Sequence, residues 1–371
     1  MEIVPTVGEA DRLARSVLRQ RLNVKPGESV TIESYSRSLP WATAFVREAR
    51  RLGARPLLHY EDEDAYWTAI EEGRASLIGT LSEAEMGALK ETDVYVYFWG
   101  PEDMARRRKL SESAAEKAVA FNSRWYEVAR KTGLRGARMA IARVTEPNAR
   151  LFGVPYRAWR DEIVTATSQD ITPMVKQATR IRQALARGRS VRIRHSNGTD
   201  LTLGLVGRPA VEAVGRVTAE NLKTAFGMMT SVPDGSVYTA VDEGVAEGTF
   251  LANRATTTAG PHRVGGRWRF QNGRLREARY QKGEASFQSG YRAGGPARER
   301  PAFIEVGLNP SLHVSPLMEE AELGMISFGV GSNASFGGKS SSPFSEYLSL
   351  AGGDLLIDDV PFVRRGRPVA G

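Results

Sequence analysis

The first half of the chain alternates between helical and strand-like patterns of apolar residues. Residues 9–22 carry leucines and valines at helical spacing, and residues 29–33 alternate between apolar and polar side chains as a strand does. Further helices are predicted at 40–52, 82–90, 103–131 and 155–187, and further strands at 55–60, 93–98 and 138–144. This alternation predicts an α/β domain over residues 1–188, with a mostly parallel sheet flanked by helices.

The second half has a different texture, in which short strand-like segments are separated by glycine-containing turns. Strands are predicted at 190–195, 200–205, 237–240, 268–270 and 354–357. Asn197-Gly198 and Asn272-Gly273 are dipeptides typical of β-hairpin turns. We therefore expect a β-rich α+β domain over residues 189–371.

Composition narrows the class of protein. The 371 residues include no cysteine, which excludes disulfides, cysteine-ligated metals and a thiol nucleophile. No run approaches the 18 apolar residues of a membrane span, and the first residues lack the basic and apolar segments of a signal peptide. We expect a cytoplasmic protein without a membrane partner. The net charge of +8 comes from arginines interleaved with acidic residues, so no nucleic-acid partner is expected either.

Residue motifs alone do not name a reaction. The four histidines, at 59, 195, 262 and 313, are never paired at a spacing that suits one metal, and the chain has no nucleophile elbow or phosphate-binding loop motif. The segment 331–342 is rich in Gly and Ser and contains one lysine, Lys339. It is interpreted either as a cradle for an anion or as a flexible loop. Carboxylates near residues 234, 243, 305 and 320 could hold a metal or transfer protons.

Several segments in order along the chain resemble the M29 metallo-aminopeptidases, the aminopeptidase T group. They include the following stretches: 24–30, 52–54, 198–201, 207–208, 233–240, 247–249, 307–310, 331–333, 336–338 and 358–359. The same segments resemble 2,5-dihydroxypyridine dioxygenase, a mononuclear iron enzyme with this fold. The resemblance covers most of the chain and implies a C-terminal domain that holds the active-site pocket and the contacts of a homodimer.

The metal ligands that this resemblance implies are replaced here. The two glutamates of the aminopeptidase site correspond to Ser236 and Phe303, and one histidine corresponds to Ser327. The terminal His-x-Asp pair corresponds to Ser345 and Tyr347. The catalytic tyrosine position falls on Ala334, and the three iron ligands of the dioxygenase fall on Phe303, Ser345 and Tyr347. No local shift of the alignment restores a histidine, because the nearest is His313. A serine hydroxyl binds a divalent metal poorly and phenylalanine does not bind one at all, so no metal or other cofactor is expected.

Three interpretations remain open. In the first, a hydroxyl-lined pocket binds a small metabolite or short peptide and performs metal-free chemistry, with Ser236, Ser327, Ser345 and Tyr347 as catalytic candidates. Four further residues are expected to contact the substrate, and the last two of them could supply a base: Phe303, Glu305, His313 and Lys339. In the second, a metal site has moved to Glu243, Glu305, His313 or Glu322, with peptidase or oxygenase activity retained. In the third, the chain is a non-catalytic ligand-binding or assembly protein.

Overall fold

The computed structural model describes residues 4–74, 81–223, 227–256, 263–313 and 315–369. The chain forms two compact units, the first made of residues 1–169 and 215–233, the second of residues 170–214 and 234–371. The predicted boundary between residues 188 and 189 differs from this division in two places. Helix α10 (Thr172–Arg187) belongs to the second unit, and strand β8 (Met229–Val232) belongs to the first.

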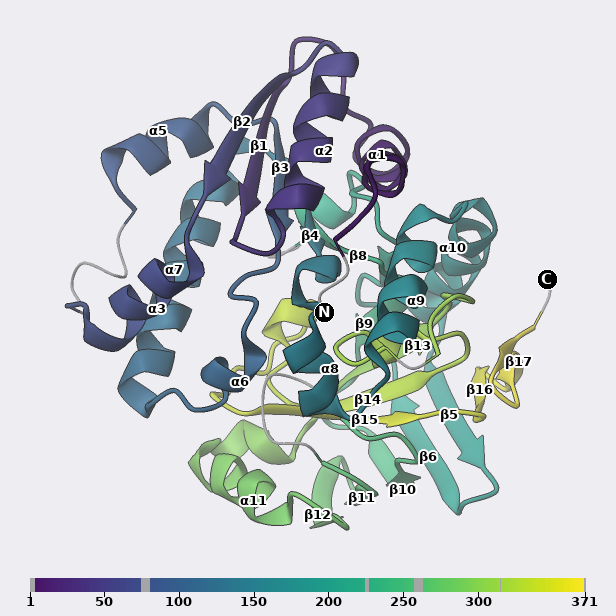
Figure 1. Cartoon of the computed structure of the whole chain (residues 1–371). Helices are drawn as coiled ribbons and strands as arrows, with labels where there is room; N and C mark the ends of the chain where they lie inside the picture. Colours follow the sequence, from purple (N-terminus) through teal and green to yellow (C-terminus); the bar gives the residue numbers. More distant parts are fainter. Residues whose placement is uncertain (1–3, 75–80, 224–226, 257–262, 314, 370–371) are drawn as a thin grey trace. The chain divides into compact units, whose positions relative to one another are not determined.

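The first unit is built on a parallel five-stranded sheet, as the sequence predicts (Figure 1). The strand order is β2-β1-β3-β4-β8, and every neighbouring pair is parallel. The strands before β8 are β1 (Ser29–Ser34), β2 (Arg55–Tyr60), β3 (Val94–Phe98) and β4 (Arg135–Met139). The chain leaves β1 toward β2 and later adds β3 on the opposite side of β1, so the sheet has a topological switch point between β1 and β3.

Helices cover both faces of this sheet. On one face lie α1 (Val7–Arg15), continued by the π-helix η1 (Ser16–Arg21), and α2 (Leu39–Arg51); on the other lie α3 (Glu63–Glu72), α5 (Glu83–Lys90) and α7 (Glu112–Thr132) (Figure 1). The remaining elements are α6 (Met104–Arg107), the 3-10 helices η2 (Ala140–Arg143) and η3 (Asn221–Lys223), α8 (Glu146–Phe152) and α9 (Tyr156–Ser168).

Three predicted elements have different limits in the structure. The helix predicted at 103–131 is two helices, because the Ser111 side chain accepts a hydrogen bond from the Ala114 amide and so starts α7 anew. The helix predicted at 155–187 is also two, with Asp170 accepting from Thr172 at the start of α10. The strand predicted at 138–144 begins earlier, at Arg135, and gives way to η2 after Met139.

The two faces of the parallel sheet differ sharply in chemistry. Val30, Ile32 and Phe98 are fully buried on the face toward α2, where Phe98 meets the ring of Phe45 at 5.2 Å. The other face carries polar and aromatic side chains in register across three strands, with Glu33 beside Tyr97 and Tyr97 beside Arg138. Both faces of a parallel sheet are normally apolar, so the second face departs from the usual pattern.

The second unit contains two sheets, as the β-rich prediction requires. The eight-stranded sheet has the order β12-β11-β10-β6-β5-β16-β17-β18. Its strands are β5 (Ser190–His195), β6 (Thr199–Gly204), β10 (Ala246–Leu251), β11 (Arg267–Gln271), β12 (Arg274–Arg279), β16 (Asp354–Ile357), β17 (Val360–Arg364) and β18 (Arg367–Pro368). Both predicted hairpin turns are present, since β5 pairs with β6 and β11 with β12.

The five-stranded sheet of this unit is antiparallel and has the order β15-β14-β13-β9-β7. Its strands are β7 (Val211–Ala213), β9 (Ser236–Ala240), β13 (Pro301–Gly307), β14 (Ile326–Gly331) and β15 (Ser345–Leu350). The helical segments of the unit are α10, α11 (Glu284–Ala293), η4 (Pro296–Glu299), η5 (Glu319–Ala321) and η6 (Ala334–Phe336).

Aromatic side chains join the two sheets of the second unit into one core. Phe328 on β14 packs against Phe250, Trp268 and Phe270 of the eight-stranded sheet, with ring centroids 5.3–5.9 Å apart. All four side chains are at most 1% exposed. This packing uses only one face of the five-stranded sheet and leaves its other face for chemistry.

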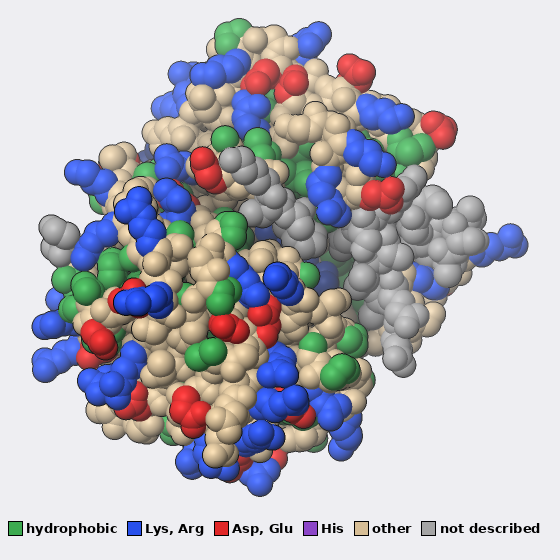
Figure 2. All heavy atoms as spheres, turned by 180° about the vertical axis from the view of Figure 1, so that it is seen from behind, with side chains coloured by type: hydrophobic (Ala, Val, Ile, Leu, Met, Phe, Trp, Pro, Cys, Tyr) green, Lys and Arg blue, Asp and Glu red, His purple; other side chains and the backbone are tan. Residues whose placement is uncertain are grey.

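Charged side chains of both signs are interspersed over the face drawn in Figure 2. The ion pairs of the protein include Arg192 with Asp200 at 2.8 Å and Arg47 with Asp11 at 2.6 Å. The mixture agrees with the interleaved arginines and acidic residues of the sequence. Among the helices of the described residues, none combines the length and apolar character needed to cross a membrane.

Candidate functional site on the five-stranded sheet

Four strands bring the sequence-predicted site residues onto one face of the five-stranded sheet. Directly paired residues of an antiparallel sheet share a face, as do alternate residues along one strand. Glu305 is paired with both Tyr238 and Ser327, Gly307 with Ser236, and Gly329 with Tyr347. Together with the two-residue alternation, these pairs place Ser236, Phe303, Glu305, Ser327, Ser345 and Tyr347 on the same face.

The strands that carry this face, β13, β14 and β15, are absent from the strands predicted by pattern. A signal for them exists, because Ile326, Phe328 and Val330 alternate with Ser and Gly, and Leu348 and Leu350 alternate with Tyr and Ser. Small polar residues and glycines on the polar face interrupt the apolar pattern of each segment, so each segment has the composition of a loop. Reading the two-residue period through the glycines predicts all three strands.

An aromatic stack fills part of the polar face. The Phe303 ring lies 3.9 Å from the Phe336 ring, with an angle of 8° between their planes, and Phe303 is only 3% exposed. A side chain at Gly329 would collide with the Phe303 ring, since an added Cβ lies 2.2 Å from it. Phe303 is therefore a packed side chain, held from one side by Phe336 and from the other by the backbone of β14.

Glu305 lies two residues farther along β13 and contacts Ser236. The Ser236 hydroxyl donates a hydrogen bond to its Oε1 at 2.6 Å. Burial raises the pKa of Glu305 above its usual value, and the Ser236 hydrogen bond offsets only part of this effect. Glu305 is thus a carboxyl group able to hold or release a proton closer to neutrality than a surface glutamate.

Gly307 lets the turn of residues 319–322, called here the acidic turn, approach the end of β13. A Cβ at Gly307 would lie 2.0 Å from the carbonyl oxygen of Glu322 and 2.6 Å from that of Glu320, so only glycine fits. The Asn309 amide donates to the carbonyl of Ala321 at 2.9 Å, which fixes the turn in place. The Gly-Leu-Asn-Pro segment at 307–310 therefore has a structural role, because it holds η5 against the polar face.

The acidic turn adds further negative charge beside Glu305. Burial, with added repulsion from Glu319, Glu305 and Asp234, raises the pKa of Glu320 well above its usual value. The Tyr347 hydroxyl donates to Glu319 at 3.3 Å, and burial followed by the neighbouring glutamates raises the pKa of Tyr347. Tyr347 is therefore a phenol that stays protonated, next to carboxylates whose charges repel one another.

The remaining predicted residues have different surroundings. The Ser327 and Ser349 hydroxyls are 2.8 Å apart, and both residues are fully buried, so the hydrogen bond between them stays inside the protein. Ser345 is exposed at the start of β15. His313 and Lys339 are exposed as well, and it is Glu305 that accepts the hydrogen bond from Ser236.

The Gly- and Ser-rich segment 331–342 is occupied by a carboxylate of the protein itself. Glu243 Oε1 accepts hydrogen bonds from the Asn333 side chain at 2.9 Å and from the Lys339 amide at 3.1 Å. Arg208 pairs with the other oxygen at 2.6 Å. Burial alone raises the pKa of Glu243, but these hydrogen bonds outweigh it and lower the pKa to about 2. The segment is thus an ordered loop that binds Glu243, and the interpretation as a free anion cradle is not supported.

Comparison with known proteins places this fold in a family. The sequence model of the family described as thermophilic metalloprotease (M29) matches residues 8–293, which is more than half of the chain. The chain belongs to the M29 family. The match ends before β13, so the strands that carry Phe303, Glu305, Ser327 and Tyr347 lie beyond the part on which it rests.

Two solved structures share the fold of this M29 chain over nearly its whole length. Wild-type AmpT from Thermus thermophilus has a TM-score of 0.73 and 18% identity, covering 98% of this chain and 99% of its own. The 2,5-dihydroxypyridine dioxygenase from Pseudomonas putida KT2440 has a TM-score of 0.63 and 16% identity, covering 99% of both chains. At these identities the likeness shows the fold alone. No curated protein matches the sequence.

The side chains of this M29 chain do not fit the metal that the family description implies. At the positions that the resemblance assigns to ligands stand three serines, a packed phenylalanine and a tyrosine, which offer no strong metal donor. The described residues contain no group of three or more His, Cys, Asp or Glu side chains arranged to hold a metal. Of the carboxylates proposed for a relocated site, Glu243 pairs with Arg208, and Glu322 pairs with Arg254 at 2.7 Å. His262 lies outside the described residues.

Proposed function

We propose that this M29 protein is an enzyme that acts on a small amine-bearing metabolite or a short peptide by metal-independent acid–base chemistry. The observation that supports this proposal most directly is the 2.6 Å hydrogen bond from Ser236 to Glu305, on the polar face of the five-stranded sheet. A carboxyl group with a raised pKa can both donate and accept a proton near neutral pH. Glu305 is the proton-transfer group in this proposal, and Ser236 positions it.

The charge of the site favours a cationic group on the substrate. Glu319 and Glu320 lie close enough to Glu305 for their charges to raise the pKa of Glu320 and Tyr347. Neither Glu305 nor Glu320 forms an ion pair with any of the described residues, and Glu320 Oε2 has no hydrogen-bond partner among them. A free ammonium group, such as the N-terminus of a short peptide, would neutralise this excess of negative charge. The Tyr347 hydroxyl, which donates to Glu319 in the structure, can exchange that hydrogen bond for one to a substrate carbonyl.

The test is an activity panel of short peptides and amino-acid amides, each compared with its N-acetylated counterpart. We expect the free amines to be turned over and the acetylated compounds to be inert. In E305Q, kcat/KM should fall by about 100-fold or more, as expected for loss of a general acid–base group. The matched control is E277Q, which changes a partly exposed carboxylate on β12 and should leave kcat/KM unchanged.

Two results would contradict the proposal. Wild-type activity in E305Q would remove Glu305 from the reaction. Elemental analysis showing about one bound metal ion per chain, together with loss of activity on chelation, would overturn the metal-independent mechanism.

A second candidate, a ligand-binding protein without catalysis, is favoured by one observation. Phe303 is packed where the resemblance expects a ligand side chain, so part of the ancestral pocket is filled. Calorimetric binding of the free amines without turnover, weakened in E305Q, would support this candidate over the enzyme.

A further inference from the structure

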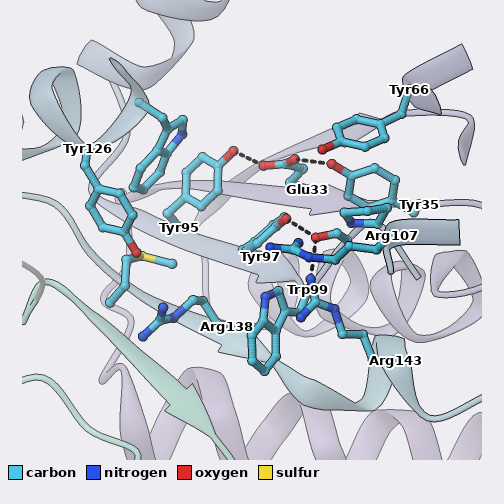
Figure 3. Close-up of a pocket in the computed structure, with 14 residues that line it drawn as sticks. Glu33, Tyr35, Tyr66, Tyr95, Tyr97, Trp99, Arg107, Tyr126, Arg138 and Arg143 are labelled. Atoms are coloured by element: carbon cyan, nitrogen blue, oxygen red, sulfur yellow. Dashed lines mark hydrogen bonds between the residues drawn. The ribbon is translucent and has the colours of Figure 1, made fainter. Parts of the chain in front are cut away.

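The first unit contains a cavity of about 210 Å³ that the sequence analysis does not find (Figure 3). It lies on the polar face of the parallel sheet, around the ends of β1 and β3. Aromatic side chains form much of its wall, among them Tyr35, Tyr66, Tyr95, Tyr97, Trp99 and Trp125. In parallel α/β sheets, ligands bind at the carboxyl ends of the strands where the strand order switches, and this sheet switches between β1 and β3.

Close approaches of the backbone shape the cavity. A Cβ at Gly100 would lie 2.0 Å from the Tyr35 ring, so glycine at this position lets Tyr35 pack against the turn that follows β3. A Cβ at Gly136 would lie 2.3 Å from the Tyr95 carbonyl oxygen and 2.4 Å from Met229 Sδ. The absence of side chains at these two positions allows Tyr35 and Met229, both part of the cavity wall, to lie where they do.

Three arginines in the wall of the cavity have no acidic partner among the described residues: Arg107, Arg138 and Arg143. Arg143 is 2% exposed, and its guanidinium makes a single hydrogen bond, to the carbonyl of Gly100 at 3.0 Å, while its Nε has no partner. Burial, followed by the charge of Arg107, lowers the pKa of Arg143 to about 9. A buried guanidinium is nearly always paired with an anion, so its charge is unmet here.

Aromatic rings surround the arginines in the wall of the cavity. The Arg143 guanidinium lies 4.0 Å from the centre of the Trp99 ring, which fixes its plane. The Tyr95 and Trp125 rings meet edge to face at 4.9 Å. A cavity of about 150 Å³ lined by apolar side chains suffices for a benzene ring, so the present volume admits a ring with a substituent.

One carboxylate also faces the cavity. Glu33 accepts hydrogen bonds from Tyr95 and from Tyr35, whose hydroxyls point at it from either side (Figure 3). Burial raises the pKa of Glu33. Because a carboxylate accepts hydrogen bonds, Glu33 can accept one from a hydroxyl group on the ring of a ligand. The arginines can then bind an anionic group of the same ligand.

We propose that this cavity is a binding site for a small aromatic carboxylate. The ring lies among the tyrosines and tryptophans, and the carboxylate pairs with Arg143 and with at least one of Arg107 and Arg138. A guanidinium and a carboxylate form two parallel hydrogen bonds, which explains why arginine supplies the charge. All residues that line the cavity belong to the first unit, and the proposal does not depend on the function proposed for the second.

The test is isothermal titration calorimetry on the full chain with benzoate, 4-hydroxybenzoate and indole-3-carboxylate. Each carboxylate is compared with benzyl alcohol, which lacks the charge, with cyclohexanecarboxylate, which lacks the aromatic ring, and with inorganic phosphate. We expect at least one aromatic carboxylate to bind at least about tenfold more tightly than all three comparison compounds, because each of these lacks either the charge-assisted pair or the ring contacts. Equal binding of phosphate would show a general anion site, and no binding of any aromatic carboxylate would show a cavity without this role; either result overturns the proposal.

Variants tie the binding to the arginines. Arg143 holds the Gly100 carbonyl and its loss endangers the fold, so the test uses the R107A/R138A double variant, whose two side chains are half-buried and make no ion pair. We expect its affinity for the aromatic carboxylate to fall about tenfold or more, with an unchanged circular dichroism spectrum. The control is R50A, which removes an exposed arginine on α2, on the opposite face of the sheet. Wild-type affinity in the double variant would overturn the proposal.

Discussion

Each unit of this protein has a five-stranded sheet with one apolar face and one polar face, and the two polar faces have opposite unmet charges. In the first unit, Arg107, Arg138 and Arg143 surround a cavity without an acidic partner among the described residues. In the second, the charge of Glu305 helps to raise the pKa of Glu320, and neither carboxyl group forms an ion pair with any of the described residues. Charge without a partner inside a protein costs stability, and this cost is the physical basis of the two ligands of opposite sign that we propose.

The two faces also differ in how their aromatic rings are used. Around the arginines, the tyrosine and tryptophan rings border an open cavity. Beside the glutamates, Phe303 and Phe336 stack on each other and fill space. The apolar faces therefore pack the cores of the two units, and the polar faces carry the side chains of the two candidate sites.

The largest effect is expected from removing a packed ring. F303A should destabilise the protein by about 3–5 kcal/mol, because Phe303 is fully enclosed by Phe336 and the β14 backbone. W99A, in the wall of the cavity, should cost less, since Trp99 borders empty space and is already partly exposed. Urea denaturation of both variants measures the difference. Equal losses would mean that the two faces are packed alike.

Much of the fold follows from the sequence, because the apolar patterns that form it are regular. In β1 and β3, Val30, Ile32, Val94 and Val96 alternate with other residues, and the helices between the strands have recognisable capping residues such as Ser82. Strand β8 is missed because its four residues join the parallel sheet from far along the chain. No local pattern reveals such a long-range pairing.

The polar faces are harder to predict, because polar residues and glycines stand at positions where apolar residues would make a strand recognisable. The resemblance to known enzymes identifies Ser236, Ser327 and Tyr347, and the strand pairing places them on one face. The acidic turn beside Glu305 depends on a contact across Gly307 that no local sequence pattern predicts. For the cavity a signal was present. Tyr95 and Tyr97 occupy alternate positions in a strand that a parallel sheet buries on both faces.

The next largest loss of stability is expected from adding a methyl group where a glycine contacts the backbone. The same substitution, glycine to alanine, tests the sheets of both units. G307A and G136A should each destabilise the protein by about 1–3 kcal/mol, because the added Cβ would meet backbone oxygen atoms at 2.0 and 2.3 Å. The control is G87A in α5, where nothing lies within 4 Å of the added atom, so stability should be unchanged or rise. Chemical denaturation of the three variants measures these effects. A neutral G307A would show that the acidic turn does not depend on this contact.

Removing a repelling charge should stabilise the protein in a pH-dependent way. Because the folded-state pKa of Glu320 is raised, folding binds a proton that the unfolded chain releases as the pH rises above about 4.5. The wild type therefore loses stability as the pH rises from there toward the folded-state pKa, and E320Q avoids this loss. Calorimetry should give equal Tm values near pH 4 and a Tm about 2–4 °C higher for E320Q near pH 8. A higher Tm for the wild type at pH 8 would contradict the unmet charge.

The smallest effect on stability is expected from a surface ion pair, in which each charge has a partner. The effect of salt distinguishes this pair from Glu320, which has no such partner among the described residues. Arg192 and Asp200 pair at 2.8 Å on the β5–β6 hairpin, with 38% and 53% of their side chains exposed. R192A should cost less than about 1 kcal/mol, and the cost should shrink at high salt because exposed charges are screened. The gain in E320Q should persist at the same salt concentration, since salt screens buried charges much less. The opposite result would be a gain in E320Q that high salt abolishes and a cost of R192A that high salt leaves unchanged. The acidic turn would then behave as a solvated surface cluster. Charge without a partner would no longer distinguish the two polar faces from the paired charges of the surface.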